Sequence, residues 1–271
     1  MFDGVNDIIF EQPDRIVIPL NWVEHIPFAF KLVEIVKPRI IVELGVHSGN
    51  SFCAFNQAIR MMNLSSKCYG VDTWLGDSQA GFYDSDVYES LSKYVDEHYQ
   101  ESAILMKCTF DDALNTFEDH SIDLLHIDGL HDYDSVLSDF KKWKRKLSNF
   151  SVILFHDTQV GYDGYGVQKL WKEIKNEFLN FEFIHCNGLG VILFGDKPNK
   201  SIINMFQYLK SHPQYIRLLQ LMGAQIYYRS YSIELEKRNN EILNLTYQYS
   251  NSTSYKLGKL VLEPFKMFKK I

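Results

Sequence analysis

The sequence predicts an α/β fold in which a doubly wound, mostly parallel sheet is followed by a helical C-terminal extension. Short apolar runs alternate with stretches of helical periodicity through the first 200 residues. Most of these runs are apolar at every position, as in strands that are buried on both faces of a parallel sheet. The composition, 46% hydrophobic and 23% charged over 271 residues, fits one large α/β domain with an appendage.

The predicted strands follow one another at regular intervals. Residues 39–45 form an apolar run that ends in a glycine, which predicts the first buried strand. Residues 51–62 carry apolar side chains at helical spacing and predict the first helix of the sheet. Further strands are predicted at 67–72, 103–108, 122–128 and 151–156.

A helix after Asp132 and a closing hairpin complete the predicted domain. The helix has one apolar face opposed by lysines, and that face comprises Val136, Leu137, Phe140, Trp143 and Leu147. Residues 181–186 and 190–195 flank a turn that contains Gly188, which predicts an antiparallel hairpin at the end of the sheet.

The charge divides the chain into two parts. From Ser201 onward there are ten Lys and Arg against four Asp and Glu, a net +6. The first 200 residues hold the other 18 basic and 30 acidic residues, a net −12, and turn-forming residues stand at the junction. We therefore predict an N-terminal segment over 1–37, a catalytic domain over 38–198, and a helical, basic extension over 199–271.

Composition disfavours several classes of protein. No apolar run reaches the roughly 18 residues of a transmembrane helix, and the start of the chain lacks the charge order of a signal peptide. The cysteines form no Cys-x-x-Cys pair, which argues against a zinc ribbon or a disulfide scaffold and favours a reducing cytoplasm. They are Cys53, Cys68, Cys108 and Cys186. The net charge of −6 argues against a nucleic-acid partner.

The first two predicted strands end in residues that suit an adenosyl ligand. Gly45 and Gly49 allow a tight turn and close approach of a ligand to the backbone. Asp72, at the end of the second strand, is placed to accept hydrogen bonds from ribose hydroxyls. Neither Gly-x-Gly-x-x-Gly nor a phosphate-binding loop is present, which disfavours a nicotinamide-dependent oxidoreductase. The alternative is an ordinary turn followed by a surface aspartate.

Two later strands also end in carboxylates. Asp128 and Asp157 are 29 residues apart, about one strand–helix–strand unit, so we expect them at one rim of the sheet. Paired carboxylates suit a hard divalent cation such as Mg²⁺, and His131 is then placed to remove a proton from a hydroxyl. In the alternative interpretation, Asp132 caps a helix while His126 and His156 are buried structural histidines.

These motifs resemble those of S-adenosylmethionine-dependent methyltransferases with a Rossmann-like, seven-stranded fold. The closer resemblance is to the group associated with bacterial glycosyltransferases and to metal-dependent sugar O-methyltransferases of macrolide biosynthesis. It covers roughly residues 38–195 and rests on Val-Glu-Leu-Gly at 42–45, Gly-Val-Asp-Thr-Trp at 70–74, His-Ile-Asp-Gly-Leu-His at 126–131 and Phe-His-Asp-Thr at 155–158.

The resemblance implies a role for each motif residue. Asp128 and Asp157 are implied as metal ligands and His131 as the general base. Where the macrolide enzymes have a carboxylate this chain has His156, a better ligand for Mn²⁺ than for Mg²⁺, so the metal and its presence stay open. Cofactor contacts are implied, in chain order, at Glu43, Gly45, Ser48, Gly49, Asp72, Phe110 and Asp111.

Aromatic residues predict where the acceptor binds. Residues 73–100 are rich in tyrosine and we interpret them as a substrate lid, although packing of a lid helix explains several of them equally well. The predicted substrate contacts are Trp74, Tyr83, Tyr133 and Tyr162, and Tyr165, in the same loop as Tyr162, is predicted to line the same cleft.

The extension and the function complete the predictions. Residues 201–248 are helix-prone with a break near Pro213 and are candidates for packing on the body or on a second copy. The lysine-rich segment 255–270 suits either an anionic membrane surface or free solution. The expected function is methyl transfer from S-adenosylmethionine to a hydroxyl of a sugar or surface glycan, in the cytoplasm and assisted by Mg or Mn. The alternatives are a phosphate-type or small phenolic acceptor, a metal-independent enzyme, or a non-catalytic binding protein.

Overall fold

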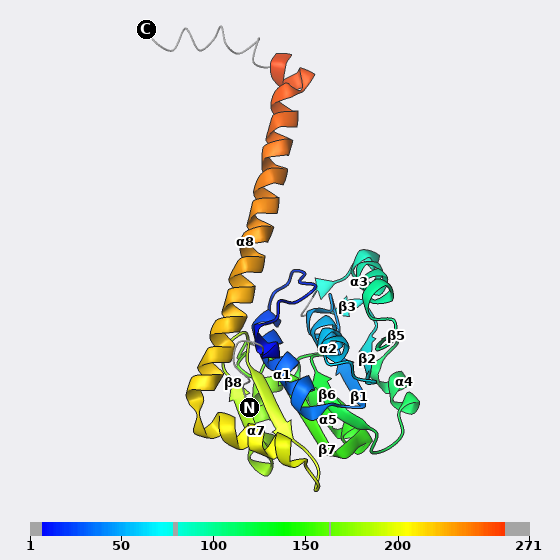
Figure 1. The fold of residues 1–271 in the computed structure, drawn as a ribbon. Helices are drawn as coiled ribbons and strands as arrows, with labels where there is room; N and C mark the ends of the chain where they lie inside the picture. Colours follow the sequence, from blue (N-terminus) through cyan, green and yellow to red (C-terminus); the bar gives the residue numbers. More distant parts are fainter. Residues whose placement is uncertain (1–6, 78–80, 163, 258–271) are drawn as a thin grey trace. The chain divides into compact units, whose positions relative to one another are not determined.

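The computed structural model describes residues 7–77, 81–162 and 164–257, and its centre is a seven-stranded sheet (Figure 1). The strand order is β5-β2-β1-β6-β7-β9-β8. The strands are β1 Ile40–Leu44, β2 Lys67–Asp72, β5 Ala103–Lys107, β6 Ile122–Ile127, β7 Leu147–His156, β8 Leu179–Phe183 and β9 Leu189–Leu193. A separate two-stranded hairpin consists of β3 Gly76–Asp77 and β4 Gly81–Phe82.

The sheet is parallel except at one strand. β1, β2, β5, β6 and β7 pair in parallel, whereas β9 runs antiparallel to both β7 and β8. All five residues of β9 are buried, which accounts for their purely apolar character apart from one glycine. The predicted fold, a mostly parallel seven-stranded sheet with an antiparallel hairpin at its end, is confirmed.

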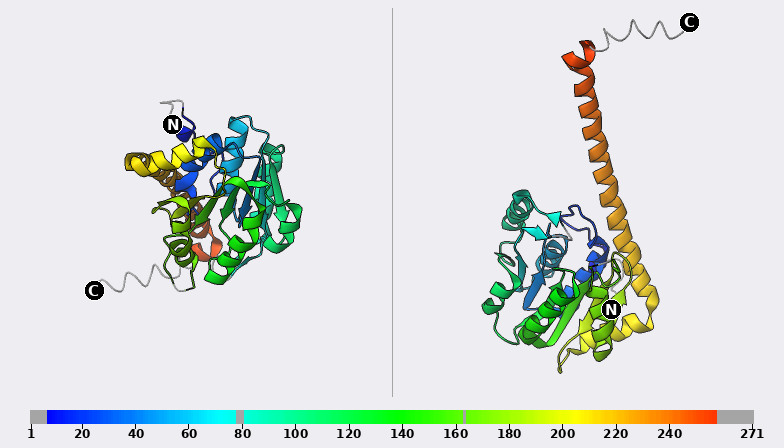
Figure 2. Two further views of the ribbon diagram at one scale, coloured as in Figure 1. Left: turned by 90° about the horizontal axis from the view of Figure 1, so that it is seen from below. Right: turned by 180° about the vertical axis from the view of Figure 1, so that it is seen from behind.

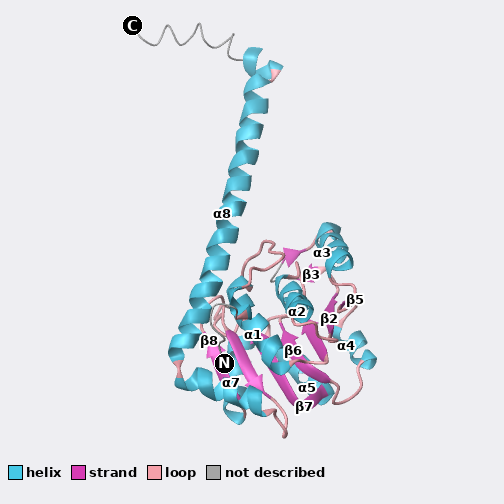
Figure 3. Cartoon of the chain, viewed as in Figure 1, coloured by secondary structure: helices cyan, strands magenta, loops and turns pink. Residues whose placement is uncertain are grey.

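Helices cover both faces of the sheet (Figures 2 and 3). Alternate residues of β6 show this division, because Leu124 packs with α1 and α2 whereas Leu125 packs with α5 and α6. The helices are α1 Ile26–Val36, α2 Asn50–Met61, α3 Ser85–His98, α4 Phe110–Ala113, α5 Tyr133–Trp143, α6 Val167–Ile174, α7 Lys200–Ser211 and α8 Pro213–Asn251. Short 3-10 turns lie at Ile8–Phe10, Val23–His25, Leu114–Thr116, Lys144–Lys146 and Lys175–Glu177.

Several element boundaries differ from the prediction, and two of the differences have a clear structural cause. Leu147 does not extend the apolar face of α5, because the helix tightens into a 3-10 turn after Trp143 and Leu147 begins β7. The hairpin strand β8 ends at Phe183 and not at Cys186. The reason is a turn in which Cys186, Asn187 and Gly188 all have positive φ, so these residues cannot continue an extended strand.

The chain forms two compact units, residues 1–227 and 228–271. The first unit contains α7, whose apolar face is buried, and the start of α8, where a Cβ on Gly223 would lie 1.9 Å from the carbonyl oxygen of Glu24. The predicted break between two C-terminal helices occurs at His212. The predicted domain boundaries after residues 37 and 198 stay predictions.

The described part of α8 beyond residue 227 forms most of the second unit. Most of the predicted membrane-binding segment 255–270 lies outside the described residues, which end at 257. None of the helices within the described ranges combines the length and the apolar character that crossing a bilayer requires.

Candidate functional site

A cavity of about 340 Å³ lies at the C-terminal ends of β1, β6 and β7. In a parallel sheet this edge carries the loops that bind ligands. The cavity is lined by Pro19, Asn21, Trp22, Gly45, Val46, His47, Ser48, Asn50, Ser51, Tyr83, Asp128, His131, His156, Asp157, Tyr165 and Asn187. The cavity thus brings the predicted glycine turn and the predicted carboxylate pair to one place.

The glycine turn after β1 packs tightly against the loop after β6. Gly45 has φ +87, and a Cβ at this position would lie 2.1 Å from the carbonyl oxygen of Asp128. Gly49 has φ +84 and begins α2, and its missing Cβ leaves room for Leu91. Both glycines are therefore required by backbone conformation and by contact.

Asp72 holds this turn through backbone hydrogen bonds. One carboxylate oxygen accepts from the amides of Val46 and His47 at 2.9 Å each, and the other accepts from the amide of Trp74 at 2.7 Å. Asp72 does not line the cavity. Its contribution in this structure is to fix the path of the turn, and its predicted ribose contact stays a prediction.

A buried polar network lies beneath the turn. Glu43 and His126 are opposite each other on β1 and β6, and the Nδ1 atom of His126 lies 2.9 Å from Oε1 of Glu43. The indole Nε1 of Trp22 donates to Nε2 of His126 at 3.1 Å, so Nε2 is the unprotonated nitrogen and Nδ1 donates to the carboxylate. Ser51 donates to the same carboxylate oxygen. Burial raises the pKa of Glu43, against the lowering effect of His126 and Ser51.

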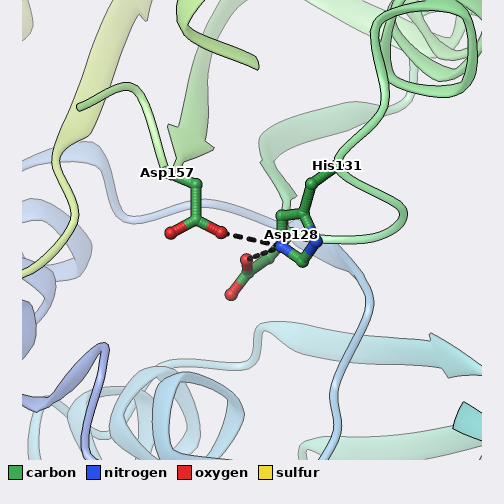
Figure 4. Close-up of side chains that lie close together, drawn as sticks. All are labelled: Asp128, His131 and Asp157. Atoms are coloured by element: carbon green, nitrogen blue, oxygen red, sulfur yellow. Dashed lines mark ion pairs between the residues drawn. The ribbon is translucent and has the colours of Figure 1, made fainter. Parts of the chain in front are cut away.

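Asp128, His131 and Asp157 form a compact triangle (Figure 4). Nε2 of His131 lies 2.7 Å from Oδ2 of Asp157 and 3.8 Å from Oδ1 of Asp128. One candidate ligand atom from each residue lies within 4.8 Å of the others. Asp157 has φ 62, an uncommon left-handed conformation that turns its carboxylate at the end of β7.

His156 completes this cluster from the buried side. Its Nδ1 atom lies 3.1 Å from Oδ1 of Asp128 and 3.4 Å from Oδ1 of Asp157. Its Nε2 atom lies 3.2 Å from the carbonyl oxygen of Cys186, to which only a protonated nitrogen can donate. Nδ1 is therefore the nitrogen that faces both carboxylates.

The histidines and aspartates stabilise each other's charges. Burial lowers the pKa of His131, but the neighbouring Asp128 and Asp157 outweigh burial and raise it to about 9. The same competition raises the pKa of His156 well above its usual value. Burial alone would raise the pKa of Asp157, yet His156 and His131 lower it to about 2. At neutral pH the cluster is therefore a set of charged pairs.

The cluster also has the donors that a divalent cation needs. Asp157 has a buried oxygen, Oδ1, with no hydrogen-bond partner among the described residues. Two carboxylates and an imidazole whose far nitrogen meets a backbone carbonyl are a familiar set of metal ligands. Asp128, Asp157 and His131 are thus the residues whose donor atoms could hold a metal ion together. His156 lies beside both carboxylates but is not part of this group, so its predicted role as a ligand stays a prediction.

An N-terminal strap, residues 12–22, forms a wall that the sequence did not predict. The side chain of Asn50 donates to the carbonyls of Val17 and Pro19 and accepts from the amide of Val17, at 2.7–2.9 Å. Gln57 holds the start of the strap in the same manner. The strap carries Pro19, Asn21 and Trp22 to the cavity, and no periodicity in this segment marks them out.

The predicted substrate residues are divided between the cavity and other places. Tyr83 lines the cavity, 4.4 Å from the ring of His47. Trp74 is buried behind it and donates to the carbonyl of His47 at 2.9 Å. Tyr133 and Tyr162 are not among the lining residues, because Tyr133 donates to Glu173 and Tyr162 is 76% exposed.

Tyr165, which was predicted together with Tyr162 to line the cleft, does line the cavity, and Asn187 lines it without having been predicted. The ring of Tyr165 stacks on His131 at 4.9 Å. The sequence signal for Tyr165 was its place in the loop after Asp157, whereas nothing in the sequence singled out Asn187.

The predicted adenine contacts lie outside the cavity lining. The ring of Phe110 covers Gly129, where a Cβ would lie 2.4 Å away. Asp111 is exposed and forms an ion pair with Lys142 at 2.7 Å. Both assignments stay predictions.

Comparison with known proteins agrees with this arrangement. Residues 42–158 match the family described as a methyltransferase domain, and the match runs from β1 to just beyond β7. It includes the glycine turn, Asp72 and the Asp128–His131–Asp157 triangle. Over residues 42–158 the chain is therefore similar to a methyltransferase domain.

Two further proteins are similar to this chain. The uncharacterized protein y4gI of Sinorhizobium fredii is 44% identical over 176 residues, which are 64% of this chain but 19% of that protein. The chain thus spans about a fifth of the length of the curated relative it matches. A putative caffeoyl-CoA O-methyltransferase from Staphylococcus aureus superposes with a TM-score of 0.51 at 12% identity, over 67% of this chain and 86% of the other. This likeness shows a shared fold.

Proposed function

We propose that this chain transfers a methyl group from S-adenosylmethionine to a hydroxyl of a sugar or glycan, with help from a divalent cation. The observation that carries the proposal is the position of Asp128, His131 and Asp157 on the same cavity as the glycine turn. One wall consists of the glycine turn, from which Gly45 and Ser48 line the cavity. The other offers groups that hold and move protons.

The cofactor residues on the cavity are those of the turn. Gly45 and Ser48 line it directly, and Glu43 lies beneath it with one carboxylate oxygen that has no hydrogen-bond partner within the described part of the chain. A buried carboxylate oxygen of this kind suits a cationic ligand group. S-adenosylmethionine supplies the electrophilic methyl group.

Asp128, Asp157 and His156 are the residues that would hold the cation. A bound divalent cation lowers the pKa of a hydroxyl and offsets carboxylate charge. The role that we assign to His131 is to take the hydroxyl proton at Nε2, the nitrogen that lies 2.7 Å from Asp157.

His131 can serve as a base only in its neutral form. Between two uncompensated carboxylates its pKa is about 9, so at neutral pH it carries a proton and cannot accept another. Offsetting the carboxylate charge removes the interaction that raises this pKa. The proposal therefore predicts that activity near pH 7 depends on a divalent cation.

The mouth of the cavity suits a hydroxyl-rich acceptor. The amides of Asn21 and Asn187 offer hydrogen-bond donors and acceptors, while Tyr83 and Tyr165 offer aromatic faces. Polar groups beside aromatic faces bind sugar rings, which are apolar on their faces and polar at their edges.

A metal-independent methyltransferase is the second candidate function. The observation that favours it is that the imidazoles of His131 and His156 already stand beside Asp128 and Asp157 and compensate their charge. In that case the base would become available only as pH rises toward 9.

Transfer of labelled methyl from S-adenosylmethionine tests the proposal across acceptors. The panel contains nucleotide sugars, lipid-linked glycans, polysaccharides, a small phenol and a phosphate-type acceptor. We expect transfer to a sugar, lost with chelator at pH 7 and restored by Mg²⁺ or Mn²⁺. Transfer to the phenol or phosphate alone contradicts the sugar assignment, and full activity in chelator supports the metal-independent candidate. Absence of S-adenosylhomocysteine binding by calorimetry contradicts both candidates.

A further inference from the structure

The second unit of the chain carries an apolar stripe that the site does not use. Residues 228–251 continue α8 as one uninterrupted helix. Its side chains are mostly exposed, including Leu235 at 42% and Ile242 at 60%. A single exposed helix gains little stability from propensity alone and usually needs a packing partner for its apolar face.

The stripe follows a heptad repeat, which is the pattern of a coiled coil. Starting at Tyr228, the residues of the stripe follow one another at alternating steps of three and four, so all of them lie on one face of the helix. The stripe consists of Tyr228, Tyr231, Leu235, Arg238, Ile242, Leu245 and Tyr249. Arg238 is its one charged member, and the other apolar residues of the helix lie off the stripe.

We infer that residues 228–249 pair with the same residues of a second copy in a parallel, in-register coiled coil. The partner is argued from the charges beside the stripe. Glu234 and Glu241 stand one position before Leu235 and Ile242, the positions that flank a coiled-coil seam.

These glutamates select the direction of pairing. In a parallel, in-register pair Glu234 faces Asn239 of the second copy and Glu241 faces Thr246, so the glutamates of the two copies do not meet. The like charges that do meet are the two Arg238 side chains, each offset by Glu234 of its own helix. In an antiparallel pair the positions before the stripe face each other. Well-overlapped antiparallel registers then bring glutamates of the two copies together, which is unfavourable.

Arg238 sets the register. Its Nε atom lies 3.0 Å from Oε1 of Glu234 in the same helix, so its charge is compensated within its own chain. A single charged residue in a seam lowers the stability of a coiled coil but disfavours shifted registers, which would place it among apolar residues of the second copy. This explains why one charge interrupts an otherwise apolar stripe.

Sedimentation of the full chain with matched variants tests the pairing. The wild-type chain should have twice the mass of 31.7 kDa. Ile242→Asp puts a charge into the seam and should raise the dissociation constant by about tenfold or more. Leu243→Asp makes the same change one position away, outside the seam, and should have no effect. A monomeric wild type, a mass above that of two copies, or equal effects of the two variants would overturn the inference.

Two further variants test register and direction. Arg238→Leu removes the seam charge and should tighten association, whereas unchanged or weaker association contradicts the role of Arg238. Leu245→Cys should form an intermolecular disulfide on mild oxidation, because identical positions meet in a parallel, in-register pair. Leu243→Cys is the control for the outer face. The parallel, in-register geometry is contradicted if Leu245→Cys and Leu243→Cys cross-link equally or if neither cross-links. The wild-type chain, oxidised in the same way, measures the cross-linking due to the native cysteines.

Discussion

The aspartates on the two sides of the cavity are held in opposite ways. Behind the glycine turn at residues 45–49, called the cofactor wall because we propose that it binds the cofactor, Asp72 accepts hydrogen bonds from three backbone amides that cannot change their charge. On the acidic wall, Asp128 and Asp157 are bound by the side chains of His131 and His156. The first arrangement fixes a backbone turn, and the second is able to gain and lose protons.

This difference separates binding from chemistry. Backbone amides do not change their protonation, so we expect changes on that wall to affect cofactor affinity. The imidazoles on the acidic wall do gain and lose protons, and the pKa of His131 is raised to about 9, so changes there should affect turnover and its pH dependence. The five predictions below test this separation, from the largest expected effect to the smallest.

The largest expected effect is on turnover. His131→Asn should lower kcat roughly 10²–10⁴-fold, because it removes the proposed general base. Affinity for S-adenosylhomocysteine, measured by calorimetry, should stay unchanged because the glycine turn is intact. His120→Asn is the control, since His120 is exposed and lies before β6, at the opposite edge of the sheet. If His131→Asn lost S-adenosylhomocysteine affinity together with turnover, cofactor binding and catalysis would not be divided between the two walls.

Gly45→Ala should damage both walls at once. The substitution forces a side chain into φ +87 and against the carbonyl of Asp128, at a cost of about 2–4 kcal/mol in the free energy of unfolding. Gly81→Ala measures the cost of the backbone conformation alone, because Gly81 has φ +86 but a Cβ added there would meet open space. That control should cost about 1 kcal/mol in urea denaturation. Equal losses for the two variants would show that the contact with Asp128 does not matter.

The acidic wall should make stability depend on pH. The pKa of His131 is raised from 6.5 to about 9, so its contribution is fully present below pH 6.5 and is lost as pH rises through 9. In chelator, the free energy of unfolding should fall by up to roughly 3 kcal/mol over this range. Denaturation at each pH measures the fall. His131→Asn should make it smaller and leave only the part due to His156, whose pKa is also raised. An unchanged slope in this variant would assign the effect to another group.

Asp72→Ala should weaken the cofactor wall alone. It leaves the amides of Val46, His47 and Trp74 without their acceptor, which costs about 1–3 kcal/mol in stability. We expect cofactor affinity to fall about tenfold as the turn loosens, since 1.4 kcal/mol corresponds to a factor of ten. Turnover at saturating cofactor should change little. A large fall in kcat with unchanged cofactor affinity would indicate that Asp72 contributes to catalysis and not to cofactor binding.

The smallest expected effect concerns two neighbouring tyrosines. Tyr165→Ala removes the ring that stacks on His131 and should cost a few-fold in kcat/KM, in line with about 0.5–1.5 kcal/mol for an aromatic contact. Tyr162→Ala changes an exposed ring outside the cavity and should be neutral. Steady-state kinetics with one acceptor compares them. A greater loss of kcat/KM in Tyr162→Ala than in Tyr165→Ala would indicate that Tyr162, as predicted from the sequence, contacts the acceptor.

The sequence predicted the fold and the acidic cluster because both follow from periodic patterns. Strands that are apolar on both faces define the sheet, and the carboxyl ends of neighbouring parallel strands must meet. That rule alone brings Asp128 and Asp157 together. The alternative interpretation also described real features, since Asp132 caps α5 and His126 is a buried, hydrogen-bonded histidine.

Contacts made by loops and other irregular segments could not be predicted from the sequence. The strap residues Asn21 and Trp22 reach the cavity through a path that Asn50 determines from a distance. Asp72 could be predicted as important, but no pattern reveals whether its carboxylate faces a ligand or its own loop. Tyr162 and Tyr165 differ in role because of the path of one loop, which local sequence does not specify.

The strap has a consequence for anyone who shortens or tags this protein. The family match begins at residue 42, yet the cavity wall includes residues 19–22, and His126 takes its hydrogen bond from Trp22. A fragment trimmed to the matched region would open the cavity on one side and leave the amide of Asn50 without its backbone partners. A fragment that keeps this wall therefore starts before Gln12, and an affinity tag inserted within the strap would disturb the hydrogen bonds that hold the wall in place.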